Sequence, residues 1–238
     1  MKNILISLFL SATAFMAHAQ NTLVVDPNAS VRSLTGDFKA IKVSGGIDLY
    51  LSQSNEVAIA VSASEEKFKE GIKTEIENGT LKIWYEWDKN GSWKNRKLKA
   101  YVSFKTLEKL NASGACDVVV TGNIESSSLD MQLSGASDFK GAVKVSSLMI
   151  NLSGASDVRI SGTASTVDIE SSGASDVKGF DLVTDVCNAK ASGASDINIT
   201  VNKEISAHAS GASDIHFKGA ALMKDIHSSG ASSVSRRS

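Results

Sequence analysis

The second half of the chain repeats one pattern of apolar and polar residues about every twenty positions. Each repeat carries the pentapeptide Ser-Gly-Ala-Ser-Asp or a near variant. The repeats align on their glycines, which are Gly114, Gly135, Gly154, Gly173, Gly193, Gly211 and Gly230. The steps between these glycines are 21, 19, 19, 20, 18 and 19 residues. A fixed period of this length is typical of a solenoid, in which each repeat forms one coil and buries its apolar side against its neighbours.

Apolar and polar positions alternate on both sides of these glycines. Four residues before them, the column is apolar or small: Leu110, Met131, Ile150, Ile169, Ala189, Ala207 and Ile226. Three residues before them lies a column that we call the polar row: Asn111, Gln132, Asn151, Glu170, Lys190, His208 and His227. Four residues after them, the column is again apolar: Val118, Phe139, Val158, Val177, Ile197, Ile215 and Val234. This alternation predicts two half-buried strands per coil, with a bend or a close backbone approach at the glycine.

Residues 36–110 lack the regular period but remain β-like. Ser44-Gly45-Gly46-Ile47-Asp48 resembles a degenerate first copy of the pentapeptide, and residues 57–61 fit a strand. Residues 65–70 fit one helical turn or a loop. Residues 81–85 and 98–104 fit a hairpin or two consecutive strands, with an Asn-Gly turn between them. We therefore predict less regular coils that begin and cap the solenoid.

The N-terminus has the features of an export signal. Lys2 precedes an apolar stretch from Ile4 to Met16, and Ala17-His18-Ala19 is a small-x-small cleavage site. Residues 1–19 are therefore predicted as a signal peptide. The apolar stretch is too short to span a membrane as a helix, and no later transmembrane segment is evident. We expect an exported protein, located in the periplasm or at the cell surface.

The rest of the chain, residues 20–238, is predicted as a single all-β domain. Its fold class is a parallel β-helix, or β-solenoid, with an irregular region at 36–110 and regular coils at 111–235. The chain has 25 basic and 26 acidic residues, so it lacks the strongly basic character expected of a nucleic-acid-binding protein. No cofactor is predicted.

Several segments together resemble a known family. They are Phe38-x-x-Ile41-x-Val43-x-Gly45, Leu81-x-Ile83, Leu107-x-x-Leu110-x-x-Ser113-Gly114 and the tandem pentapeptides. The chain from about Gly36 to Val234 resembles the putative auto-transporter adhesin, head GIN domain family of exported bacterial proteins. The resemblance implies a parallel β-helix, an envelope location in Gram-negative bacteria and an adhesive role. It supplies no catalytic residues. Cys116 and Ser233 depart from the repeated motif.

A column of carboxylates follows the glycines: Asp117, Asp138, Asp157, Asp176, Asp196 and Asp214. Like charges at the spacing of adjacent coils repel by about 1 kcal/mol per pair in water. One solution is Ca²⁺ held between Asp138, Asp157, Asp176 and Asp196. The other is that the carboxylates cap backbone amides and are screened by the basic side chains two residues on, which are Lys140, Arg159, Lys178 and His216. We favour the second.

The second serine of each pentapeptide is expected to point inward: Ser137, Ser156, Ser175, Ser195 and Ser213. Cys116 takes this position in the first copy, and Cys187 lies in an apolar column. Their coils are separated by ~15–20 Å, beyond the reach of a disulfide. The sequence therefore predicts two free, buried thiols.

Two other groups are candidate sites. His208 and His227 share the polar row in consecutive coils, so their rings should lie within ~5 Å and could share a transition metal. Because no third ligand is evident, we favour ordinary solvent-facing histidines. Trp84, Tyr85, Trp87 and Trp93 form an aromatic cluster, which either covers the open end of the solenoid or binds a sugar or protein. We favour the cover.

The sequence offers no constellation of catalytic residues. It lacks the G-x-S-x-G elbow, a phosphate loop and H-E-x-x-H, and the repeats carry short side chains in uniform rows. We therefore predict an exported, non-enzymatic, adhesin-like scaffold or binding protein whose partner is an envelope glycan or protein. The alternative is a carbohydrate-binding or carbohydrate-cleaving protein that uses the region from Trp84 to Trp93. Exposed solenoid ends also allow a homodimer.

Overall fold

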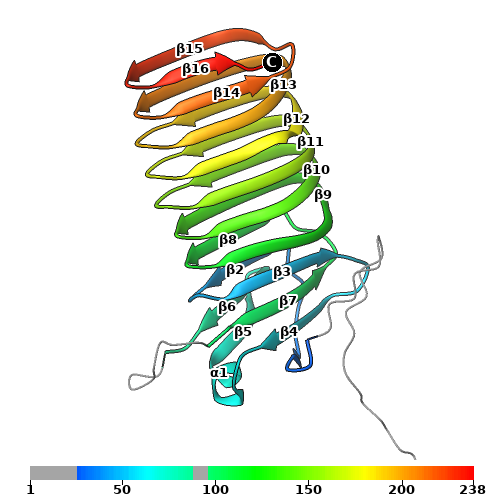
Figure 1. Ribbon diagram of the computed structural model, residues 1–238. Helices are drawn as coiled ribbons and strands as arrows, with labels where there is room; N and C mark the ends of the chain where they lie inside the picture. The colour runs from blue at the N-terminus through cyan, green and yellow to red at the C-terminus, as the bar shows by residue number, and fades with distance from the viewer. Residues whose placement is uncertain (1–25, 88–95) are drawn as a thin grey trace, which may run out of the picture.

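The computed structural model describes residues 26–87 and 96–238, whose strands form one sheet wound into a solenoid (Figure 1). The N-terminal part contains β1 (Ser30–Arg32), β2 (Ala40–Ser44), β3 (Asp48–Gln53), β4 (Ala58–Ser62), α1 (Glu66–Gly71), β5 (Ile72–Glu77), β6 (Thr80–Tyr85) and β7 (Lys99–Phe104). The repeating part contains β8 (Lys109–Gly114), β9 (Asp117–Gly135), β10 (Asp138–Leu152), β11 (Asp157–Ser171), β12 (Asp176–Ala191), β13 (Asp196–Gly211), β14 (Asp214–Lys218), β15 (Leu222–Gly230) and β16 (Ser233–Arg236). The predicted β-solenoid is confirmed.

The structure bears on one of the two predictions about export and the membrane. The predicted signal peptide, residues 1–19, lies outside the described residues. Within the described ranges, no helix is long and apolar enough to cross a membrane.

Consecutive coils of the repeating part stack in register. β10 pairs in parallel with β9 below it and β11 above it, and Ile150 lies opposite Met131 and Ile169. The parallel pairing continues through β12 and β13 to β14 and β15. The predicted apolar columns are buried, as Phe139 and Val158 illustrate with exposures of 1% and 0%. Equivalent residues therefore form rows along the axis of the solenoid.

The coils from β9 to β13 each have one long bent strand where two separate strands were expected, whereas the last full coil has two, β14 and β15. β10 and β11 have 15 residues each, and β12 and β13 have 16. Pairing is disturbed only locally, for example between Arg159 and Gly162, and Gly162 has a φ of 108°. Hydrogen bonding between these coils thus continues around the bend, and β9 to β13 end at or near the glycine corner.

The glycine corner brings the backbones of successive coils into close contact. Gly173 has a φ of 83°, a conformation that residues with a side chain rarely adopt. A Cβ built on Gly173 would lie 2.4 Å from the carbonyl oxygen of Gly154. The same oxygen accepts a hydrogen bond from the amide of Ala174 at 2.8 Å. The corner therefore has no room for a side chain at this position.

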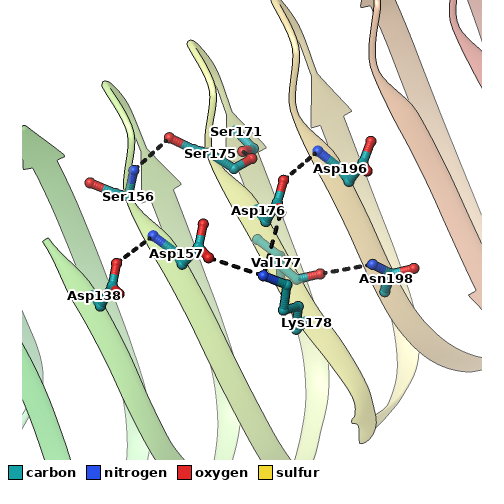
Figure 2. Close-up of polar contacts among 10 residues, drawn as sticks. All are labelled: Asp138, Ser156, Asp157, Ser171, Ser175, Asp176, Val177, Lys178, Asp196 and Asn198. Atoms are coloured by element: carbon teal, nitrogen blue, oxygen red, sulfur yellow. Dashed lines mark hydrogen bonds and ion pairs between the residues drawn. The ribbon is translucent and has the colours of Figure 1, made fainter. Parts of the chain in front are cut away.

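A ladder of inward-facing serines lies beside the glycines, as the sequence predicted. Ser137, Ser156, Ser175, Ser195 and Ser213 are all 0% exposed. The hydroxyl of Ser156 donates to the carbonyl of Ser153 at 3.2 Å and accepts from the amide of Ser137 at 3.3 Å. The amide of Ser156 in turn donates to Ser175 Oγ at 3.1 Å (Figure 2). The hydroxyls thus satisfy backbone groups that the corner leaves without a strand partner.

The chain order of the N-terminal coils differs from their order in space. β2 lies between β6 and β8, and β3 lies between β7 and β9, all in parallel. The first coil of the chain is therefore the second coil of the solenoid. β6 and β7 are consecutive strands of one coil and do not form a hairpin with each other. This resolves the choice that the sequence left open.

The two ends of the solenoid differ. Antiparallel strands β1, β4 and β5 and the short helix α1 lie at the N-terminal end (Figure 1). These antiparallel pairings correct the expectation of coils alone in this region. At the other end β15 is exposed along its length apart from a half-buried Ile226, and Leu222 is 60% exposed.

Candidate binding face

The aspartate column links each coil to the next through the backbone. Asp138 Oδ1 accepts the amide of Asp157 at 3.1 Å, and Asp176 Oδ1 accepts the amide of Asp196 at 3.3 Å (Figure 2). Asp196 repeats the contact with the amide of Asp214 at 3.2 Å. Asp138, Asp176 and Asp196 therefore each cap the first amide of the strand above, as in the structural alternative that we favoured.

Charge on the column is balanced in part by basic side chains. Lys178 Nζ lies 3.0 Å from Asp157 Oδ2 and 3.5 Å from Asp176 Oδ2 (Figure 2). The hydrogen bond with Asp157 raises the pKa of Lys178, and a hydrogen bond from Ser233 lowers the pKa of Asp214. Asp48, the aspartate of the degenerate first pentapeptide, lies near Asp117 at the N-terminal end of the column. Burial raises the pKa of Asp48.

Two substitutions of Asp176 distinguish the contribution of its hydrogen-bond acceptor from that of its negative charge. We expect Asp176→Ala to lower the free energy of unfolding by about 1 kcal/mol, because the Asp196 amide loses its acceptor. Asp176→Asn keeps an oxygen acceptor, so its change should stay within about 0.5 kcal/mol. Guanidinium denaturation followed by circular dichroism measures both variants. Equal losses in the two would show that the charge, not the acceptor, matters.

Calcium binding by the aspartate column stays the untested alternative to the structural role that we favour. Within the two described ranges, one group of at least three possible metal ligands lies close enough to share an ion. That group does not include these aspartates. If Ca²⁺ bridges Asp157 and Asp176, calcium chloride will raise the melting temperature of the wild type over a chelator control. The rise will be smaller in Asp176→Asn.

The polar row lines two shallow hollows on one outer face of the solenoid. One hollow, of about 430 Å³, is lined by Gln132, Leu133, Ser134, Asn151, Leu152, Ser153, Glu170 and Ser172. The other, of about 340 Å³, is lined by Glu170, Ser171, Lys190, Ala191, Ser192, His208, Ala209, Ser210, His227 and Ser229. Because Glu170 belongs to both, the hollows meet. We call this continuous surface, from Gln132 to Ser229, the polar groove.

The last coils bring three ligand-type side chains together at one end of the polar groove. The rings of His208 and His227 have centroids 4.9 Å apart, as their shared row predicted. Asp225 lies between them, with Oδ2 at 3.0 Å from His208 Nε2 and Oδ1 at 2.7 Å from His227 Nε2. The hydrogen bond with His208 lowers the pKa of Asp225. Asp225 was missed by the sequence analysis, although it precedes His227 by two residues and so shares its face.

Two members of the predicted aromatic cluster, Tyr85 and Trp87, pack around a buried arginine near the α1-capped end of the solenoid, whereas Trp84 faces the other side of β6. The Arg96 guanidinium lies 4.8 Å from the centroid of the Tyr85 ring and 4.7 Å from that of Trp87. Tyr85 and Trp87 make an edge-to-face contact with centroids 5.0 Å apart. Tyr85 is buried, Trp84 is half-buried and Trp87 is 42% exposed.

One member of the predicted cluster, Trp93, lies outside the described residues. The sequence analysis did not predict the role of Arg96, because a basic residue that lies near aromatic residues in the sequence is usually exposed and gives no sign that it is buried. Whether the cluster covers the end or binds a ligand stays a prediction, although the packing of Tyr85 and Arg96 fits the cover.

The cysteines are placed as predicted. Cys116 and Cys187 are free and fully buried. Cys116 Sγ lies 3.3 Å from the carbonyl oxygen of Ser113, so the thiol occupies the position of a ladder serine. Burial raises the pKa of the Cys187 thiol to about 12. A thiol with a raised pKa is a poor nucleophile at neutral pH.

Known proteins resemble the chain in both sequence and fold. The family described as "Putative auto-transporter adhesin, head GIN domain" matches residues 37–221. The structure resembles that of a putative adhesin from Bacteroides fragilis, with a TM-score of 0.80, 20% identity and coverage of 89% of this chain and 98% of the other. It also resembles a protein named as a putative lipid binding protein from Parabacteroides distasonis, with a TM-score of 0.67, 19% identity and coverage of 89% and 97%. At these identities the likeness shows the fold. No curated protein matches the chain.

Proposed function

Because the chain belongs to the putative auto-transporter adhesin, head GIN domain family, we propose that it is a non-catalytic adhesin that binds an extended glycan along the polar groove. The observation that carries this proposal is the continuity of the groove. Two hollows meet at Glu170 and follow consecutive coils from Gln132 to Ser229. A long, shallow surface with both polar and apolar lining suits a chain-like ligand better than a small molecule, which needs an enclosed pocket.

The chemistry of the groove supports a hydroxyl-rich ligand. Its polar row offers amides at Gln132 and Asn151, and its edge offers serine hydroxyls. These groups both donate and accept hydrogen bonds, as sugar hydroxyls do. Each contact is weak, but repetition on successive coils lets several act on one polymer, which raises the overall affinity.

The arrangement of charged groups supports a binding role without catalysis. Hydrolysis of a glycosidic bond commonly uses two carboxyl groups about 5–9.5 Å apart across the bond. Glu170 supplies the one carboxylate of the polar row, and the next residue along the row is Lys190. An adhesive role also agrees with export to the periplasm or cell surface, which we infer from the N-terminal signal.

A second candidate site has one observation in its favour. Trp87 is 42% exposed beside the guanidinium of Arg96, and exposed tryptophans stack on sugar rings. The cluster from Trp84 to Trp93 is therefore an alternative site for the same class of ligand.

Glycan binding by matched variants tests the proposal. The groove variant combines Gln132→Ala, Asn151→Ala and Glu170→Ala, one residue each from β9, β10 and β11. The control variant combines Glu125→Ala, Lys144→Ala and Thr163→Ala, which are exposed residues in register on the same three strands. We expect the groove variant to bind envelope polysaccharides at least about tenfold more weakly than wild type, and the control to match wild type.

The same measurement separates the alternatives. Loss of binding in Trp87→Ala with full binding in the groove variant would assign the ligand to the aromatic cluster. Release of new reducing ends by the wild type would contradict a non-catalytic role. Failure of every glycan to bind, with circular dichroism showing folded protein, would contradict the proposal itself.

A further inference from the structure

The last two coils place two imidazoles and one carboxylate around a common point. β13 and β15 pair in parallel, and this pairing sets His208 directly opposite His227. Asp225 precedes His227 by two residues, so both side chains leave β15 on the same face. The pairing shifts by one residue between Ile205 and Ser206, which leaves Lys224 as the extra residue and sets Asp225 opposite Ser206. The stacking of coils thus brings the three groups together.

The distances between the three ligand atoms are close to those around a bound metal ion, so small side-chain movements would suffice to bind one. The ligand atoms of His208, Asp225 and His227 all lie within 4.8 Å of one another. Zinc–nitrogen bonds of about 2.0–2.1 Å in a tetrahedron separate neighbouring ligand atoms by about 3.3 Å. The present separations of 3.0 Å and 2.7 Å between each Nε2 and the carboxylate already lie near this value. Both histidines are at least partly exposed, so an ion can enter from solvent.

We propose that His208, Asp225 and His227 form a binding site for a divalent transition-metal ion of the zinc type. Two imidazoles and one carboxylate are ligands that Zn²⁺ prefers, whereas Ca²⁺ and Mg²⁺ take oxygen ligands. The three side chains leave the fourth position of a tetrahedron to water or to a ligand in the polar groove, because His208 and His227 also line its end.

The ion would fasten the exposed last coil to the solenoid. β15 contributes Asp225 and His227, and it is the outer strand at the open end, with Leu222 60% and Met223 52% exposed. β13 contributes His208 and is held by β12 on its other side. A metal that joins the two strands therefore stabilises a strand whose side chains are almost all exposed. Lys190 lies opposite His208 on β12, and it is the next residue of the polar row whose positive charge would repel the ion.

Titration with zinc chloride tests the site directly. The protein is purified without a polyhistidine tag, stripped with a chelator and studied by isothermal titration calorimetry. We expect one Zn²⁺ per chain in the wild type and at least about tenfold weaker binding in Asp225→Asn and in His227→Ala. His216→Gln is the matched control, because His216 lies outside the cluster and contacts Ser235 and Arg237 instead. It should bind Zn²⁺ as the wild type does.

Hydrogen exchange gives a second readout that depends on location. Zn²⁺ should slow exchange of the amides of β15 in wild type and in His216→Gln, with no slowing in His227→Ala. The three substituted positions are exposed or half-buried, so the variants should keep the circular dichroism spectrum of the wild type. Absence of Zn²⁺ binding by the wild type would overturn the proposal. Equal affinity in wild type and His227→Ala would overturn it as well.

Discussion

Gly173→Ala is expected to lower the free energy of unfolding by about 2–6 kcal/mol, or to prevent folding. Two costs add at this corner. A non-glycine residue at a φ of 83° is strained, which costs about 1–3 kcal/mol. The new Cβ would also lie 2.4 Å from a backbone oxygen of Gly154, and relieving this overlap costs about another 1–3 kcal/mol. Because a backbone oxygen cannot rotate away, two adjacent coils must separate. Guanidinium denaturation measures the loss.

Gly122→Ala is the matched control for this prediction. Gly122 lies in β9 and has a φ of 78°, but a Cβ there would meet no atom within 4 Å. Its substitution should cost only the backbone strain, about 1–3 kcal/mol. Similar losses at Gly173 and Gly122 would contradict the close approach of successive corners.

Ser156→Ala should have the second largest effect, about 2–4 kcal/mol. The Ser156 hydroxyl is fully buried, accepts from the amide of Ser137 and donates to the carbonyl of Ser153. Alanine leaves the buried Ser137 amide without an acceptor, which costs about 1–3 kcal/mol, and removes the part-buried hydrogen bond to the Ser153 carbonyl, which adds about 1 kcal/mol. The volume change is small, so the loss reports on hydrogen bonding. Thermal and guanidinium denaturation give the value.

Two variants place this effect in context. Ser156→Cys should lose about half as much, because Cys116 fills the equivalent position of the first repeat and its sulfur lies 3.3 Å from the carbonyl of Ser113. Ser147→Ala, at an exposed position on β10, should change stability by less than about 0.5 kcal/mol. If Ser156→Ala were as mild as Ser147→Ala, the ladder would have no structural role.

The regular coils follow from the sequence because their information is local and repeated. Alternation around each glycine assigns Phe139 to the interior and Gln132 to the surface, and parallel stacking of equal repeats then sets each row. Burial of Cys116 and Cys187 and the approach of His208 to His227 follow from the same rows. Bending of one long strand in place of two was not foreseen, because hydrogen bonding between coils is not encoded by residue type.

The N-terminal region was harder to predict because its pairings are distant in sequence. β2 pairs with β6 and β8, and strand patterns alone do not reveal that one coil is inserted between two later ones. Antiparallel β5 has much the same alternation as the parallel strands and β4 is buried on both faces, so neither pattern reveals the direction of pairing. At the candidate sites, Asp225 could have been found from its spacing to His227. Lys224, the extra residue of the final pairing, has no counterpart in a pattern of columns.

Binding affinity as a function of glycan length tests the central claim, that recognition is spread along the polar groove over consecutive coils. The measurement is calorimetric titration of wild-type protein with a size series of the polysaccharide that binds best in the screen. The account predicts that affinity rises stepwise as the oligosaccharide lengthens from one hollow to both, and that Gln132→Ala and His208→Ala each remove only part of it. Full affinity for a mono- or disaccharide, lost entirely through one substitution, would contradict it.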